Sequence, residues 1–162
     1  MTPNHALTAL VLVLASAAIA SRSEAYTPDV TILARTCVAE SGTILTADCA
    51  AILHVLERRG ARVGRTAAET ALRYASVHRA PQGELGRSVR YASLMTLAER
   101  APAVVALVIA WVRGERVADP CRGATHWGAP NGRDLERAQR AGWRRVRCSE
   151  PTANAFWREG PR

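Results

Sequence analysis

Apolar positions recur at helical spacing between residues 29 and 42, and we expect a helix there on which the rest of the chain is organised. Its apolar stripe consists of Val30, Leu33, Ala34, Cys37 and Val38. Glu40 follows at the edge of this stripe, and Gly42 is a typical helix end. The negative end of a helix dipole disfavours a charged carboxylate in the last turn, which suits a general acid. A glutamate that only lines the rim of the helix end would show the same spacing.

The pattern after this helix predicts three more helices separated by short breaks. A second helix is expected at about 47–59, with Thr46 as its N-cap and Gly60 as its end. A capping box formed by Thr66 and Glu69 opens a third helix that extends to about Val77. Residues 79–88 contain proline and glycine and are predicted to form a loop, and a weaker helix follows at 91–100.

The segment 102–113 is apolar on nearly all sides. Pro102 suits a first helical turn, Gly114 is a good stop, and the segment is too short to cross a membrane. A helix without a polar face belongs in the middle of a helical domain, so we expect this one to be the buried central helix. The predicted fold class is mostly α, with a C-terminal region of loops and short β-structure.

Polar and aromatic residues gather in the last third of the chain. Thr125, His126 and Trp127 end a loop, at 119–127, that contains proline and glycine. Trp127 and Trp143 suit a platform for the apolar face of a sugar ring; core positions are the alternative, open for Trp127 and favoured for Trp143. Residues 143–148 and 155–158 are predicted to form a short hairpin or irregular strands, and Asp134 is predicted to cap a short helix at 135–140.

The first twenty residues resemble an export signal. Residues 6–20 are apolar or small, and Ala18-Ile19-Ala20 matches an Ala-x-Ala cleavage site. A second cleavage position follows Ala25, and the alternative is an anchor that is not cleaved, although the run is short for a membrane span. We therefore predict a signal peptide at 1–20, a single domain at 26–162, export to the periplasm, cell wall or medium, and no stable membrane anchor after cleavage.

The chain is strongly basic, with a formal charge of +8, and all 22 basic residues are arginine. A basic surface attracts polyanions, of which nucleic acid and an anionic cell-wall polymer are two. The arginines are scattered, with few aromatic residues between them. We therefore expect no dedicated nucleic-acid partner.

Four cysteines in an exported chain predict disulfides, for which three connectivities are possible. We expect Cys37–Cys49 and Cys121–Cys148, because each pair joins neighbouring elements. No metal site is expected, since the chain has no Cys-x-x-Cys pair and its histidine spacing matches no zinc template. A cysteine nucleophile paired with His126 is the remaining alternative, and the even number of cysteines argues against it.

Four segments resemble motifs of the spore-cortex-lytic type of cell-wall hydrolases, within the lysozyme-like superfamily. Residues 34–42 (ARTCVAESG) resemble that family's active-site helix, and 50–58 (AAILHVLER) resemble the helix that follows it. Residues 119–127 (DPCRGATHW) resemble its Gly-Ala-Thr-His loop. Residues 152–157 (TANAFW) resemble its closing segment, where Asn or His precedes an aromatic pair. The order and spacing agree over about residues 30–158.

This resemblance implies a lysozyme-like helical domain that acts on the glycan strands of peptidoglycan. It implies that Glu40 is the catalytic acid and that Thr125 and His126 line the cleft. Trp127 and Tyr91 are also predicted to bind the substrate. We expect a monomer that needs no cofactor.

Two positions depart from the family's pattern. Glu57 precedes an arginine where the family usually has Asn, and Trp127-Gly128 replaces a second aromatic residue or His. Cys37 and Cys49 are an addition. Substrate preference therefore stays open, as does the alternative of a catalytically inactive lysozyme-like protein that binds glycan or builds an envelope or phage particle.

No second acidic residue stands out as a catalytic partner for Glu40. A two-carboxylate hydrolase needs one across the cleaved bond, and each remaining acid has a structural reason to be where it is. These acids are Asp48, Glu57, Asp119 and Asp134. A single glutamate suffices if the 6-hydroxyl of the muramic acid is the nucleophile. The prediction is therefore a lytic transglycosylase that releases 1,6-anhydro-muramoyl products, with a hydrolysing muramidase as the alternative.

Overall fold

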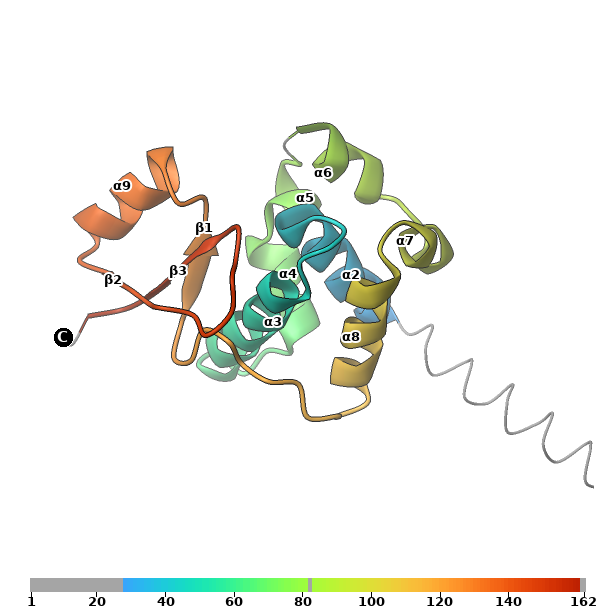
Figure 1. Cartoon of the computed structure of the whole chain (residues 1–162), viewed down its shortest axis with the longest axis horizontal. Coiled ribbons are helices and arrows are strands. Elements are labelled where there is room, and N and C mark those ends of the chain that lie inside the picture. The colour runs from blue at the N-terminus through green and yellow to red at the C-terminus, as the bar shows by residue number, and fades with distance from the viewer. Residues whose placement is uncertain (1–27, 82, 161–162) are drawn as a thin grey trace, which may run out of the picture.

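The computed structural model describes residues 28–81 and 83–160, and Figure 1 shows their helices and strands. Within these residues the elements are α2 (Pro28–Ser41), α3 (Thr46–Ala61), α4 (Ala67–Tyr74), α5 (Ser76–Arg79), α6 (Gly83–Val89), α7 (Leu94–Arg100), α8 (Pro102–Val112), β1 (His126–Gly128), α9 (Gly132–Arg140), β2 (Arg144–Arg145) and β3 (Ala155–Arg158). The prediction of a mostly α fold with a short C-terminal β region is confirmed. The predicted signal peptide at 1–20 lies outside the described residues.

Helices α2 to α8 form a helical body. Helix α2 lies at its centre and packs against every helix from α3 to α8. The stripe predicted to face the core is buried: Val30, Leu33, Ala34, Cys37 and Val38. Helix α3 is the second buried helix, and its fully buried side chains are Ile52, Leu53, Val55 and Leu56. Burial of each such side chain contributes roughly 1.5–3 kcal/mol, and α2 and α3 supply more of the main core than any other pair of helices.

Helix α8 is not the buried central helix that its composition predicts. Only Val104, Val105 and Val108 are buried, on the face that packs against α2, α3 and α7. Pro102 and Val112 are exposed at its two ends. The centre is already occupied by α2 and α3, so α8 lies at one side of the helical body and buries one stripe (Figure 1).

The third helix ends earlier than predicted. The capping box of Thr66 and Glu69 is present and opens α4. The helix does not continue to Val77, because Ala75 takes up an extended backbone and a new short helix, α5, begins at Ser76. Thr46 is not an N-cap: α3 begins at Thr46 itself, and the residue before it makes no side-chain capping hydrogen bond.

The predicted loop at 79–88 contains a helix, α6. Gly83 adopts a positive φ of 67° at its start, which a glycine tolerates without strain. Gly86 and Val89 are buried, so packing against the helical body outweighs the weak helix propensity of the glycines. The predicted helix at 91–100 begins only at Leu94, after the N-cap Ser93.

A three-stranded antiparallel sheet, in the order β1-β3-β2, lies on one side of the helical body with α9 beside it (Figure 1). The pairing of β2 with β3 confirms the predicted short hairpin. Cross-strand partners share a face. Trp127 and Phe156 are partners on the face that packs in the main core, whereas His126 and Trp157 are partners on the face that packs towards α9.

Both predicted disulfides are present, Cys37–Cys49 between α2 and α3 and Cys121–Cys148 in the C-terminal part. Two disulfides fit an oxidising environment such as that of exported proteins. Among the described residues, no helix is both long and apolar enough to cross a membrane.

Candidate functional site

The Glu40 carboxylate, in the last turn of α2, is half-buried and accepts three hydrogen bonds. Ser76 donates two of them to Oε1, from its backbone N–H at 3.2 Å and its hydroxyl at 2.7 Å. The indole N–H of Trp127 donates to Oε2 at 3.3 Å. The carboxylate therefore lies where α2, α5 and β1 meet, at the seam between the helical body and the sheet.

Local backbone features place these donors. The extended backbone at Ala75 interrupts the helix, so the N–H of Ser76 is one of the first in α5 and has no partner within that helix. It turns instead to Glu40. Trp127 reaches the carboxylate because its cross-strand partner, Phe156, holds that face of the sheet against the main core.

The hydroxyl of Ser76 suits both protonation states of Glu40. It donates to the carboxylate in this structure, and after rotation its oxygen can accept a hydrogen bond from a protonated Glu40. Ser76 can therefore stay hydrogen-bonded to Glu40 both before and after Glu40 transfers a proton. The arrangement is therefore chemically able to support acid and then base catalysis by one residue.

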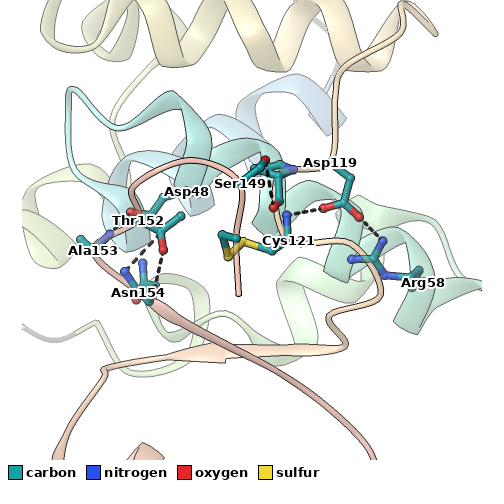
Figure 2. The surroundings of a disulfide bond; sticks show 10 residues. Asp48, Arg58, Asp119, Cys121, Ser149, Thr152, Ala153 and Asn154 are labelled. Atoms are coloured by element: carbon teal, nitrogen blue, oxygen red, sulfur yellow. Dashed lines mark hydrogen bonds and ion pairs between the residues drawn. A yellow bond between two sulfur atoms is a disulfide. The ribbon is translucent and has the colours of Figure 1, made fainter. Parts of the chain in front are cut away.

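A buried carboxylate holds residues 153–154 next to the backbone of Glu40. Asp48 is 0% exposed and accepts hydrogen bonds from the backbone N–H of Ala153, at 2.7 Å, and of Asn154, at 3.2 Å (Figure 2). The side chain of Asn154 donates to the backbone carbonyl of Glu40 at 2.7 Å. Burial raises the pKa of Asp48, although the N–H donors act in the opposite direction. Asp48 thus fixes Asn154 against the end of α2.

His126 lies on the face of the sheet opposite Trp127, away from the Glu40 carboxylate, and Thr125 precedes it in the chain. Thr125 is buried, and its hydroxyl oxygen is 3.0 Å from Nδ1 of His126. The His126 ring stacks on Trp143 with 3.5 Å between ring centroids. Burial lowers the pKa of His126 to about 4, and the nearby Arg59 acts in the same direction. Of the residues predicted to bind the substrate, the structure therefore brings only Trp127 into contact with Glu40.

Tyr91 lies in the turn between α6 and α7 and is 80% exposed. The guanidinium of Arg90 is 5.3 Å from the centre of its ring. The next residue, Ala92, accepts a hydrogen bond from Arg35, which precedes Glu40 by about one and a half turns of α2. Tyr91 is thus placed along α2 from Glu40 and is open to solvent.

Asp119, in the loop before β1, forms an ion pair with Arg58 on α3 (Figure 2). Its Oδ2 accepts from Nη1 of Arg58 at 2.6 Å, and its Oδ1 accepts from the backbone N–H of Cys121 at 3.0 Å. Nε of Arg58 also donates to the carbonyl of Ala124 at 2.7 Å. Asp119 therefore orders the loop that carries the Cys121–Cys148 disulfide.

Asp134 and Glu57 also have local roles. Asp134 lies in the first turn of α9 and accepts from the backbone N–H of Ala129 at 3.0 Å, rather than capping the helix. Gly128 makes this approach possible, because a Cβ there would lie 2.7 Å from an Asp134 carboxylate oxygen. This explains why glycine follows Trp127. Glu57 is exposed and lies 3.8 Å from His54.

No group of three or more His, Cys, Asp or Glu side chains that could hold a metal ion occurs in residues 28–81 and 83–160. The cysteines of this part of the chain are all in disulfides.

Two residues of the site are not among those predicted from the sequence. Ser76 carries no signal, since nothing in the pattern around it marks the break between α4 and α5. From the sequence, Asp48 looks like an ordinary acidic residue in the first turn of a helix. Its burial depends on a segment about a hundred residues later in the chain. Asn154 belongs to the closing segment that the family resemblance singles out.

Comparisons with known proteins add no relative to this picture. A scan against models of protein families, a search of curated proteins and a search of solved structures each return no match.

Proposed function

We propose that the protein is an exported glycosidase that cleaves peptidoglycan, acting as a lytic transglycosylase with Glu40 as its single acid and base. The observation that carries the proposal is the convergence of three donor groups, from Ser76 and Trp127, on the Glu40 carboxylate. The donors come from two separate parts of the fold. The same residue is the one that the resemblance to cell-wall hydrolases identifies as the acid.

In the proposed reaction Glu40 gives its proton to the glycosidic oxygen as the bond from that oxygen to C1 of the muramic acid breaks. The carboxylate then accepts the proton of the 6-hydroxyl, whose oxygen forms the new bond to C1. Glu40 returns to its acid form, and no water is consumed. Ser76 stays hydrogen-bonded to Glu40 throughout by reversing its hydroxyl.

The roles of the other acidic residues support a mechanism with one carboxylate. Asp48 is fully buried and hydrogen-bonded to the backbone of 153–154, and Asp119 is paired with Arg58. Asp134 accepts from the backbone before α9. None of these three is free to activate a water molecule without first giving up these partners.

The test compares wall clearing by wild type and by Glu40→Gln on purified sacculi, measured as loss of turbidity. Gln keeps the shape of the side chain but cannot transfer a proton, so we expect a loss of roughly a hundredfold or more. The matched control is Glu84→Gln, on the exposed first turn of α6, which should clear the wall as wild type does. A folded Glu40→Gln variant with near wild-type clearing would refute the proposal.

A catalytically inactive glycan-binding protein is the second candidate. The observation that favours it is that all three hydrogen bonds of Glu40 can equally serve to join α2, α5 and β1. In that case the wild type would bind sacculi without clearing them, and Glu40→Gln would bind as wild type does but unfold more readily.

A further inference from the structure

An open cavity of about 360 Å³ lies in the C-terminal segment that links β2 to β3. Its polar lining consists of Arg145, Arg147, Glu150, Thr152 and Asn154, and Phe156 belongs to its apolar wall. The cavity is therefore built from a different part of the chain than the donors of the Glu40 carboxylate.

The cavity lining carries net positive charge, since it contains Arg145 and Arg147 against the single carboxylate of Glu150. Arg145 and Arg147 make no ion pair with any carboxylate in the described part of the chain. Arg144 stands directly opposite Arg158 in the sheet, a like-charged pair that is unfavourable unless an anion lies nearby. The carboxylate next to Arg158, Glu159, is already paired with Arg62 on α3.

Two residues connect this cavity to Glu40. Asn154 lines the cavity, and its side chain donates to the backbone carbonyl of Glu40 at 2.7 Å. Phe156 lines it as well, and its cross-strand partner Trp127 donates to the Glu40 carboxylate. A ligand in the cavity would thus lie beside residues that contact Glu40 and pair with Trp127.

We propose that this cavity binds a carboxylate of the short peptide that a muramic acid carries, so that the protein prefers peptide-bearing glycan over bare glycan. The inference rests on the proposed function, because it takes peptidoglycan as the substrate. Guanidinium groups recognise carboxylates through paired hydrogen bonds, which fits Arg145 and Arg147. Glu150 in the same lining disfavours a polyanion such as a glycerol phosphate polymer and suits a ligand with a single carboxylate and neutral amides.

The experiment measures binding by calorimetry in the full chain carrying Glu40→Gln, so that the glycan is not cleaved. The probes are a muropeptide disaccharide, the same disaccharide without its peptide, and poly(glycerol phosphate). We expect the muropeptide to bind about tenfold or more tightly than the bare disaccharide. Adding Arg145→Gln and Arg147→Gln should abolish this advantage. The control adds Arg116→Gln and Arg133→Gln, both at exposed positions. It removes the same amount of charge and should preserve the tighter binding of the muropeptide.

Equal binding of the two disaccharides would overturn the inference, as would equal losses in the two double variants. Tighter binding of poly(glycerol phosphate) than of the muropeptide would also overturn it. If the double variant in the cavity fails to fold by circular dichroism, Arg145→Lys is used, which keeps the charge but loses the paired hydrogen bonds and should lose part of the advantage. Wall clearing by wild type is measured separately, so a protein that binds as expected but clears no wall would refute the proposed function alone.

Discussion

At the scale of single residues, the donors of Glu40 can be removed one at a time. Trp127→Phe keeps an aromatic ring against the core and removes only the indole N–H that Oε2 accepts. Ser76→Ala removes the hydroxyl and keeps the backbone N–H. These two changes separate the contribution of each donor to the reaction from its contribution to folding.

We expect Trp127→Phe and Ser76→Ala each to lower the rate of wall clearing about tenfold, because each removes one hydrogen bond to a charged group. The measurement is the initial rate on sacculi at saturating protein. Trp111→Phe on α8 is the matched control and should retain the wild-type rate. Rates unchanged in both Trp127→Phe and Ser76→Ala would show that these donors do not contribute to catalysis.

His126 gives a pH-dependent contribution to stability with a defined sign. Burial lowers its pKa from 6.5 to about 4 in the folded state, so between these values the unfolded chain binds a proton that the folded chain does not. The contribution is fully present above pH 6.5 and is lost as the pH falls towards 4, by at most about 3 kcal/mol. We expect the wild type to lose unfolding free energy relative to His126→Phe as the pH falls from 6.5 towards 4, measured in urea titrations. Parallel stability curves would contradict the burial of a neutral imidazole.

At the scale of elements, the sequence pattern predicts α2, α3 and the capping box of α4, because these depend on residues close together in the chain. It also predicts both disulfides, because each pair of cysteines joins neighbouring elements. It does not predict the break at Ala75, which has no proline or glycine. That break directs Ser76 to Glu40, so the feature that matters most for the site has no local signal. Helix α6 is missed for the related reason that packing, rather than propensity, stabilises it.

The Cys37–Cys49 disulfide holds together the two helices at the centre of the fold. Replacing both cysteines by serine frees the short connection between α2 and α3 in the unfolded chain and should lower the free energy of unfolding by about 2–4 kcal/mol. Denaturant titration measures this loss. The Cys121–Cys148 disulfide closes a longer loop, and its replacement by two serines serves as the comparison. A loss below about 1 kcal/mol for Cys37 and Cys49 would mean that α2 and α3 are held by packing alone.

At the scale of the whole molecule, the seam between the helical body and the C-terminal sheet brings the site together. The sequence predicts the two regions and assigns Glu40 and Trp127 to one site, but it does not predict the hydrogen bond from the Trp127 indole to the Glu40 carboxylate. It also makes the apolar helix 102–113 the centre, whereas α2 and α3 occupy that place. Composition shows how apolar a helix is, but which helix lies innermost depends on how all of the helices pack against one another.

Asp48 is the buried link across this seam. Asp48→Ala leaves the N–H groups of Ala153 and Asn154 without their acceptor, so we expect a loss of about 1–3 kcal/mol in the free energy of unfolding. Wall clearing should fall as well, because Asn154 is no longer fixed against Glu40. Asp29→Ala, at the exposed start of α2, is the control and should change stability by only a few tenths of a kcal/mol. Unchanged stability in Asp48→Ala would show that this link does not hold the C-terminal segment.

The most direct measurement of the central claim is the mass of the fragments that the wild type releases from purified sacculi. A single-glutamate site in which the 6-hydroxyl of muramic acid is the nucleophile predicts 1,6-anhydro-muramoyl fragments, each one water lighter than the hydrolytic product. Glu40→Gln should release neither kind. Fragments that end mainly in reducing muramic acid would contradict the account, because hydrolysis needs a second carboxylate that Asp119 could supply only by giving up its pairing with Arg58.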